Sequence, residues 1–362
     1  MMAQTLRNQK PLSAFVAVCT FYVTYLIVST TNYSPDLLSR NSDVKILPKM
    51  KTVDKIKHIA FLRVPKTGSS TLACIFLRFG IRNKLDIYLP KIIYVSRKKQ
   101  KLLLEEKKCY DIFVIHTYYD STFFTNIVPR DSPIIGLVRE PIQRIISHAF
   151  YFKHLRKRKE MKSLSEQEFI HKVLRNTANY GAENVMATYF GMERNGMERN
   201  QTKKDYIHQY LESLNTSFSL VLVLEKFNES LVLLKRILNW SFADILYGAK
   251  KVNTYGQVPL GEEEKNKLIS NNMLDFEIYN YFMKELESKV KRERNDFQLE
   301  VLHFENILHR VKTFCDNAVN GSKIEFPSSK WDRSFEVLSS ECELIFRMDI
   351  ADIKKRSIIN LV

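Results

Sequence analysis

The sequence predicts an α/β fold in which a central parallel sheet is flanked by helices and preceded by a single transmembrane helix. Short, nearly continuous apolar runs recur along the chain, and helix-compatible segments lie between them. Such runs are typical of parallel strands that are buried on both faces. A long uncharged stretch near the amino terminus predicts the membrane helix.

The uncharged stretch extends from Pro11 to Pro35, and its apolar part, Leu12–Thr30, is about long enough to cross a bilayer. Arg7 and Lys10 precede it, and no small-residue cleavage pattern follows. We therefore expect an uncleaved signal anchor rather than a cleaved signal peptide or a buried helix. The predicted organisation is a cytosolic tail (1–10), a transmembrane signal anchor (11–31), a stem (32–55) and a lumenal domain (56–362).

The composition fits a lumenal protein that binds an anion. The chain has 56 Lys and Arg against 40 Asp and Glu, a net charge of +16. Such an excess often indicates nucleic-acid binding, but in a lumenal protein it suits an anionic cofactor or the anionic face of a membrane, and much of it is expected to be solvated surface. We expect no nucleic acid. No CxxC or His-rich spacing predicts a metal, and the pairing of Cys315 with Cys342 in an oxidising lumen stays open. Six N-glycosylation sequons support the secretory pathway: Asn32, Asn200, Asn215, Asn228, Asn239 and Asn320.

The first predicted strand is Ile59–Val64, and Pro65 ends it. Lys66–Thr71 is a polar turn of small residues, and Leu72–Phe79 has the apolar content of a buried helix. Gly80 follows this run, so we expect it to form the C-cap of the helix.

A strand, a tight polar turn and a helix N-terminus together can hold a phosphate-like anion, because backbone N–H groups and the helix dipole face it. Hydroxyls and a lysine would complete this cradle. The spacing differs from that of a nucleotide triphosphatase P-loop, since Lys66 precedes Gly68, and this argues against a nucleotide kinase. An ordinary capped turn is the alternative. The expected anion ligands are Lys66, Thr67, Gly68, Ser69, Ser70 and Thr71.

A second strand is predicted at Pro133–Val138, and it leads directly into Arg139. Pro141 suits the first position of a helix that continues through Ile142–Phe152. Arg139 would then lie at the carboxyl end of a parallel strand, where open α/β sheets bind ligands. Ser147, two turns into the helix, can face the same ligand. Two anion sites at two strand ends are what a nucleotide with phosphates at two positions requires.

Two candidates for a general base follow two further predicted strands. His116 follows the apolar run Ile112–Ile115, and Glu225 ends the run Ser219–Glu225. A lone histidine is usually structural, and a carboxylate at a strand end often caps a helix. Their position on the same edge as the anion ligands favours a functional role, and both candidates stay open. Helical patterns follow at 228–239 and 262–314, and no clear pattern follows Cys315.

Three stretches carry a resemblance to a known family. VPKTGSSTL, followed by LVREPIQRIIS, resembles the paired signature of Golgi sulfotransferases. SLVLVLEKFNESLVLLKRILNW (219–240) and LDFEIYNYF (274–282) are similar to the galactose 3-O-sulfotransferases, which include a galactosylceramide type. The resemblance covers roughly residues 59–289.

The resemblance implies a P-loop-like sulfotransferase fold that uses 3′-phosphoadenosine 5′-phosphosulfate as co-substrate, without a metal. The first motif would hold the 5′-phosphosulfate, and Arg139 and Ser147 the 3′-phosphate. Lys66 would neutralise charge on the leaving oxygen, and His116 matches the position of the base in related heparan sulfate enzymes. The implied acceptor is the 3-hydroxyl of galactose on a glycolipid or glycoprotein, and the implied location is the Golgi membrane.

Two other functions stay open at this point. The chain could sulfate a glycosaminoglycan or another glycan, or it could be a catalytically silent glycan-binding relative. The sequence does not decide between a glycolipid and a glycoprotein acceptor. It also leaves the oligomeric state open, and a homodimer is one alternative. The sequence GMERN occurs twice in tandem, at 191–195 and 196–200, and we assign no function to this repeat.

Overall fold

The computed structural model describes residues 54–90, 92, 94–192, 203–248, 259–347, 350 and 352, which belong to one compact unit. The predicted tail, the predicted anchor at Leu12–Thr30 and nearly all of the predicted stem lie outside these residues. So does most of the GMERN repeat. Within the described ranges, no helix is both long and apolar enough to cross a membrane.

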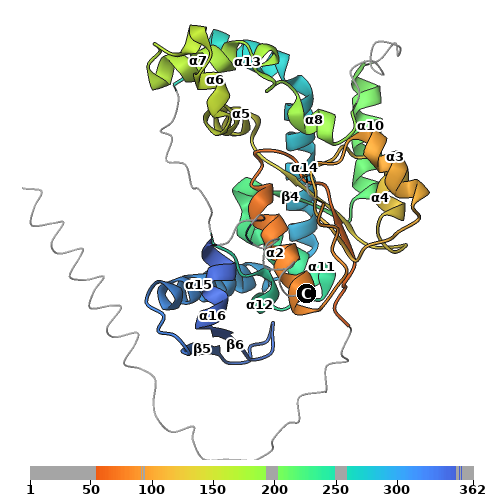
Figure 1. Ribbon diagram of the computed structural model, residues 1–362, viewed down its shortest axis with the longest axis vertical. Coiled ribbons are helices and arrows are strands. Elements are labelled where there is room, and N and C mark those ends of the chain that lie inside the picture. The colour runs from red at the N-terminus through yellow and green to blue at the C-terminus, as the bar shows by residue number, and fades with distance from the viewer. Residues whose placement is uncertain are drawn as a thin grey trace, which may run out of the picture. The chain divides into compact units, whose positions relative to one another are not determined.

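A four-stranded parallel sheet forms the centre of the unit (Figure 1). Its strands are β1 (Ile59–Phe61), β2 (Ile112–Phe113), β3 (Ile134–Val138) and β4 (Leu220–Val223). Their order is β2-β1-β3-β4, and every neighbouring pair is parallel. The predicted α/β class, with a parallel sheet flanked by helices, is confirmed. Each strand is shorter than its apolar run in the sequence.

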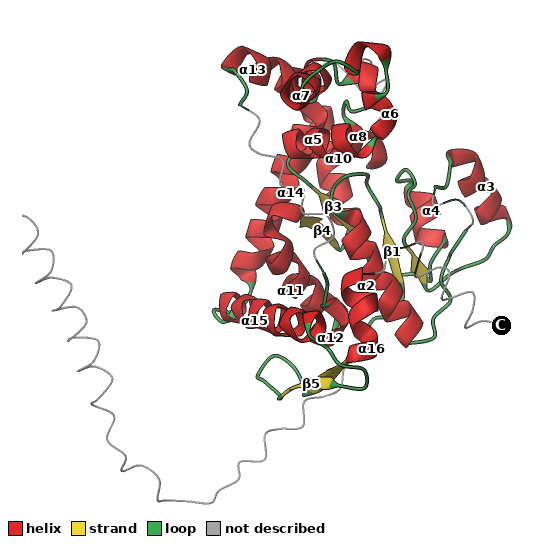
Figure 2. Ribbon diagram, turned by 60° about the vertical axis from the view of Figure 1, so that its left-hand side comes forward, coloured by secondary structure: helices red, strands yellow, loops and turns green. Residues whose placement is uncertain are grey.

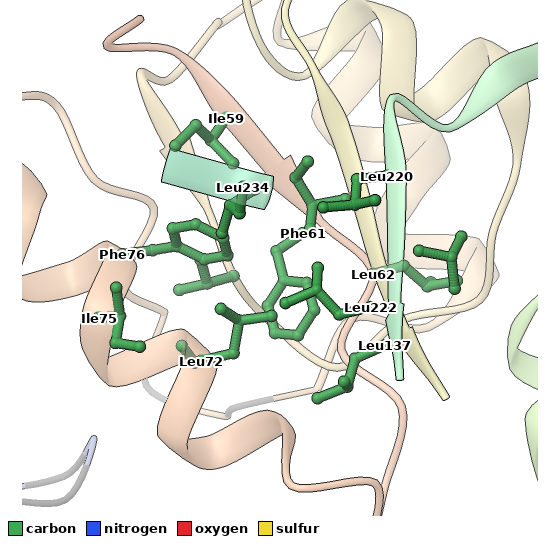
Figure 3. Close-up of a cluster of buried hydrophobic side chains, with 14 of the residues drawn as sticks. Ile59, Phe61, Leu62, Leu72, Ile75, Phe76, Leu137, Leu220, Leu222 and Leu234 are labelled. Carbon is green, nitrogen blue, oxygen red and sulfur yellow. The ribbon is translucent and has the colours of Figure 1, made fainter. Parts of the chain in front are cut away.

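Helices α2 (Ser69–Arg82) and α11 (Phe227–Leu238) pack on the sheet. Leu72 and Phe76 of α2 lie with Leu234 of α11 over Phe61 and Leu222 of the strands (Figure 3). All five side chains are completely buried. This burial explains why both helices and strands appear in the sequence as apolar runs.

Gly80 does not form a C-cap, so that prediction is wrong. Helix α2 continues through Gly80 to Arg82, and Asn83 is its C-cap. A Cβ atom at Gly80 would lie 2.8 Å from Ile87 Cδ1 and 3.3 Å from Ile112 Cγ1. The glycine therefore allows α2 to approach β2 closely, which the sequence pattern could not distinguish from a helix end.

A second group of helices, which includes the helix that follows β3, shares a separate hydrophobic cluster (Figure 2). It comprises α5 (Pro141–Tyr151), α6 (Lys153–Arg156), α7 (Glu166–Arg175) and α13 (Glu262–Asn271). Pro141 occupies the first turn of α5, as predicted. The adjacent short helix is α8 (Val185–Tyr189).

The predicted helical region 262–314 consists of α13 and two longer helices, α14 (Met273–Arg292) and α15 (Phe297–Asp316). A hairpin of β5 (Lys323–Phe326) and β6 (Phe335–Leu338) follows. Cys315 and Cys342 form a disulfide that joins α15 to α16 (Ser339–Cys342). The remaining elements are α3 (Arg97–Glu105), α4 (Ser121–Asn126), α10 (Lys203–Ser217), α12 (Phe242–Ile245), and short turns η1 (Lys159–Met161), η2 (Ala178–Tyr180), η3 (Leu224–Lys226) and η4 (Glu343–Arg347).

Candidate active site

Hydrogen bonds tie the carboxyl ends of neighbouring strands together. Because the strands are parallel, all of them end at one edge of the sheet. Beyond β2, Nδ1 of His116 lies 2.7 Å from the carbonyl oxygen of Arg63, which follows β1. Beyond β3, Nη1 of Arg139 donates to the Lys66 carbonyl at 3.1 Å. The structure therefore brings His116 and Arg139 to the segment that follows β1, although the three lie far apart in the sequence.

Glu225, the second base candidate, lies at the end of β4 in the turn η3. Its carboxylate accepts the Glu140 N–H at 2.9 Å. Burial, together with Glu225 and Glu140, raises the pKa of Tyr279, and Glu225 is also the hydrogen-bond partner of that phenol. The carboxylate is thus bonded both to the start of α5 and to α14.

The turn between β1 and α2 has the backbone shape of an anion cradle. Lys66 and Gly68 both have positive φ, at 68° and 84°. Gly68 is the N-cap residue of α2, and its first turn contains no acidic side chain. A Cβ atom at Gly68 would lie 2.6 Å from Leu224 Cδ1, so only glycine fits the turn without a shift. The N-terminus of α2 consequently offers N–H groups and a positive dipole end to an anion.

Not all predicted donors of the cradle are turned outward. The hydroxyls of Thr67 and Ser69 donate to the Val64 carbonyl at 3.0 and 2.6 Å, and both side chains are buried. The Thr71 N–H donates to the Gly68 carbonyl at 3.0 Å. These bonds hold the turn in shape. Ser69 and Ser70 are the first-turn positions whose N–H groups the helix does not use.

Lys66 reaches from the cradle to α5. Its ammonium nitrogen lies 3.7 Å from the ring centroid of Tyr151, at the end of α5. Burial and the Arg144 guanidinium lower the pKa of His148 to about 4, and the charge of Lys66 contributes to this shift. The carboxyl end of α5 therefore contacts Lys66. Ser147, one turn earlier in α5, is buried, and its role as a phosphate ligand stays a prediction.

Arg139 is a partly desolvated cation between two carboxylates. Burial lowers its pKa below the usual range, and Glu225 and Glu140 oppose this shift. A guanidinium with incomplete hydration binds phosphate strongly, because less water has to be displaced. Arg139 therefore lies at the end of β3, where the sequence places an anion ligand, and its role as that ligand stays a prediction.

His116 is a neutral imidazole of defined tautomer. A carbonyl oxygen accepts hydrogen bonds only, so Nδ1 carries the proton that is donated to Arg63, and Nε2 carries the lone pair. Burial and the Arg63 guanidinium lower the pKa of His116 to about 3. The imidazole therefore stays neutral, with Nε2 unprotonated, throughout the physiological pH range.

Sequence reasoning missed two residues of this site. Arg63 is buried, and its Nη2 donates to the Ser70 hydroxyl at 3.1 Å, so it links the cradle to His116. The signal available was a charged residue within an apolar run. Tyr151, which contacts Lys66, had no signal in the sequence. Among the described residues, no group of three or more His, Cys, Asp or Glu side chains is arranged to hold a metal ion.

Together, the parallel sheet and the turn at its edge define an α/β protein with a candidate anion-binding site at its strand ends. Comparison with known proteins gives the family. Residues 5–324 match the family described as Galactose-3-O-sulfotransferase. The chain belongs to this family, and it is a sulfotransferase.

Individual relatives are distant but match over long regions. Galactose-3-O-sulfotransferase 2 of Mus musculus is 25% identical over 274 residues, 70% of this chain and 68% of the relative. Galactosylceramide sulfotransferase of Homo sapiens is 27% identical over 290 residues, 74% and 67% of the two chains. Galactose-3-O-sulfotransferase 2 of Sus scrofa is 25% identical over 327 residues, 82% and 78%. The resemblance in the sequence motifs is confirmed.

Proposed function

We propose that the protein transfers the sulfuryl group of 3′-phosphoadenosine 5′-phosphosulfate to the 3-hydroxyl of a galactose residue on a glycolipid or glycoprotein. One observation carries the proposal beyond family membership: a line of contacts joins the base candidate to the cradle. Arg63 bonds through its side chain to Ser70 and through its carbonyl to His116. The names of the relatives, which include galactose and galactosylceramide, support a galactose acceptor.

Two positively charged sites support binding of the anionic nucleotide. The N-terminus of α2 and Lys66 suit the 5′-phosphosulfate, since N–H groups, the dipole and an ammonium converge there. Arg139, at the junction of β3 and α5, and Ser147, two turns into α5, are the proposed ligands of the 3′-phosphate. The Arg139 bond to the Lys66 carbonyl keeps the two sites at a fixed separation.

In the proposed reaction, Nε2 of His116 takes the proton of the acceptor hydroxyl while the hydroxyl oxygen forms a bond to sulfur. The bond from sulfur to the bridging phosphate oxygen breaks, and 3′-phosphoadenosine 5′-phosphate leaves. Lys66 compensates the charge that grows on the bridging oxygen. Positioning and charge stabilisation supply most of the rate, as in phosphoryl transfer, and the scheme requires no metal.

We also propose that the protein is a single-pass type II protein of the Golgi membrane, with the described residues in the lumen. The Cys315–Cys342 disulfide supports an oxidising compartment, and the sequons Asn239 and Asn320 are exposed. Carbonate washing should leave the full chain in membranes, and peptide N-glycosidase should increase its gel mobility. Recovery of a secreted chain that begins near residue 31 would contradict the anchor.

The function is tested with the full-length protein and radiolabelled donor, against a panel of galactosides, lactosides and heparan. We expect label on the galactose 3-hydroxyl of galactosides and lactosides. Transfer to heparan alone would support the other glycan acceptor, and absence of transfer would support a silent relative.

Calorimetry should show tighter binding of 3′-phosphoadenosine 5′-phosphate than of adenosine monophosphate, and equal affinities would contradict the two-anion site.

A further inference from the structure

A cluster of tyrosine rings extends from His116 along the edge of the sheet. The ring centroids of Tyr118 and Tyr189 lie 5.1 Å apart, and those of Tyr94 and Tyr118 lie 6.0 Å apart. Tyr189 also meets the His116 imidazole, with 6.3 Å between centroids. We call Tyr94, Tyr118 and Tyr189 the tyrosine platform. The chemistry proposed above gives these rings no role.

The backbone places Tyr118 on the same side of the chain as His116. Thr117, between them, is completely buried, and its hydroxyl donates to the Val95 carbonyl at 2.7 Å. Both His116 and Tyr118 are only partly buried. Successive side chains of an extended segment point to opposite sides, so the residues on either side of Thr117 share a face.

The other two members of the platform are also fixed by backbone contacts. Tyr94 pairs with His116 in a parallel bridge beyond the end of β2. The carbonyl of Tyr189, the last residue of α8, accepts the Tyr119 N–H at 2.7 Å. The platform is therefore assembled from three separate segments of the chain beside one catalytic candidate.

The platform combines apolar ring faces with neutral hydroxyl groups. Burial raises the pKa of Tyr189 to about 12, and burial and the hydrogen bond with Tyr118 raise that of Tyr94. The Tyr94 side chain is 38% exposed. Arg97 lies over the Tyr118 ring, 5.6 Å from its centroid, and adds a cationic donor at the rim. Such surfaces bind flat ligands that present apolar faces and polar edges.

We propose that the tyrosine platform is the acceptor subsite, on which the galactose ring lies with its 3-hydroxyl directed at His116. This inference rests on the proposed function. The contacts run in sequence from Ser70 of the cradle through Arg63 and His116 to Tyr189. If the cradle holds the sulfuryl donor, the acceptor hydroxyl has to meet His116 at Nε2, since Nδ1 is bonded to the Arg63 carbonyl, and Tyr189 borders the same imidazole.

The shape of galactose matches such a platform. Its axial 4-hydroxyl leaves the C–H bonds of C3, C4 and C5 on one face of the pyranose ring, and this apolar face can stack on an aromatic ring. The 3-hydroxyl is equatorial and projects from the edge of the ring. A galactose stacked on the Tyr189 ring, with the Tyr118 ring beside it at an angle of 52°, would therefore present the 3-hydroxyl sideways, toward the neighbouring imidazole.

The test compares leucine and phenylalanine variants of the full-length protein. Tyr189→Leu and Tyr118→Leu should raise the KM for lactose by about tenfold or more, because the stacking face is lost. The affinity for 3′-phosphoadenosine 5′-phosphate should stay within about twofold of the wild-type value, since the contacts from the platform to the cradle pass through His116 and Arg63. Tyr189→Phe keeps the aromatic ring, so its KM for lactose should stay close to the wild-type value.

Tyr110→Leu is the matched control, because Tyr110 pairs with Tyr88 before β2, at the opposite end of that strand from His116. It should leave the KM for lactose unchanged. If either leucine variant does not fold, Tyr94→Leu, at a more exposed position, replaces it. Wild-type KM values in the leucine variants, or an equal rise in nucleotide Kd, would overturn the inference while leaving the proposed function intact. Failure of the wild-type protein to sulfate any galactoside would instead reject the proposed function.

Discussion

At the scale of single residues, the Arg63–His116 contact determines what the histidine can do. The carbonyl fixes the tautomer, and burial together with the guanidinium keeps the ring neutral. A pKa of about 3 makes a weak base, however, and proton transfer is most efficient when the pKa lies near the working pH. An anionic donor in the cradle would raise this pKa by stabilising the imidazolium, so the base would gain strength only when the donor is bound.

The first prediction separates chemistry from binding at His116. His116→Ala should lower kcat by about 10²–10⁴-fold, the usual contribution of a general base, with nucleotide affinity nearly unchanged. Lys66→Ala should reduce both nucleotide affinity and turnover, because the ammonium compensates charge on the leaving group. Single-turnover sulfate transfer at saturating donor measures the chemical step.

Glu225→Gln is the companion variant, because it keeps the shape of the side chain and removes its charge. Glu225 already bonds to the Glu140 N–H, so we expect a modest effect on chemistry. If His116→Ala kept the wild-type rate and Glu225→Gln abolished transfer with nucleotide binding intact, the carboxylate would be the base.

At the scale of elements, the junction of β1 and α2 contains local strain of the kind found at binding sites. Lys66, a residue with a Cβ atom, has a φ of 68°, and Gly68 follows at 84°. A left-handed conformation costs a non-glycine residue roughly 1–2 kcal/mol. The bonds from Thr67 and Ser69 to the Val64 carbonyl, together with the bond from Arg139 to the Lys66 carbonyl, hold the turn in place despite this cost.

The second prediction concerns this turn. Gly68→Ala should weaken binding of 3′-phosphoadenosine 5′-phosphate by about tenfold or more, because the new Cβ meets Leu224 and displaces the N–H groups of the cradle. Gly321→Ala is the control, since Gly321 has a similar φ of 81° with no atom within 4 Å of its added Cβ. Calorimetry gives the affinity, and thermal melting gives the stability.

Both substitutions should cost a similar amount of backbone strain, roughly 1–2 kcal/mol of folding free energy. Only Gly68→Ala should also lose affinity. Equal nucleotide binding by the two variants would mean that the α2 N-terminus is not the phosphosulfate site.

At the scale of the whole molecule, buried polar groups connect α5 to α14 and η2, and α14 to α8. The side chains of Arg144 on α5 and Asp275 on α14 are both fully inaccessible, with 3.4 Å between Nε and Oδ2. Asp275 also accepts the Ala187 N–H at 2.9 Å. Nearby, Nε2 of His148 donates to the Tyr180 carbonyl at 2.9 Å. These groups fix α5 against its neighbours, and they make stability depend on pH.

The third prediction is a loss of stability in acid. The pKa values of His116 and His148 are lowered to about 3 and about 4, below the unfolded value of about 6.5. The unfolded chain therefore binds more protons as pH falls from about 6.5 toward 4. Stability should be fully present above this window and fall through it, by up to about 1.4 kcal/mol per pH unit for each histidine.

Thermal melting of the full-length protein across this pH range measures the effect. His148→Gln removes one titrating group and keeps a donor for the Tyr180 carbonyl, so its melting temperature should fall less steeply with acid than that of the wild type. Parallel curves for the two proteins would show that His148 is not held neutral in the fold.

The sequence by itself determined the parts of the fold that depend on local pattern. Apolar runs between polar turns predicted the parallel strands, since strands buried on both faces must be apolar throughout. Polar residues directly after those runs predicted Lys66, His116 and Arg139 at strand ends. The motifs predicted the family. Gly80 was misassigned because a glycine needed for close packing looks the same in a sequence as a glycine that ends a helix.

Only the tertiary structure decided which strand ends become neighbours and what each side chain contacts. The order β2-β1-β3-β4 places His116 beside Arg63, and no local pattern contains that pairing. The same holds for the contact of Lys66 with Tyr151 and for the tyrosine platform, whose rings come from three distant segments. Hydrogen bonding, desolvation and ring packing depend on distances across the chain, and those distances exist only after folding.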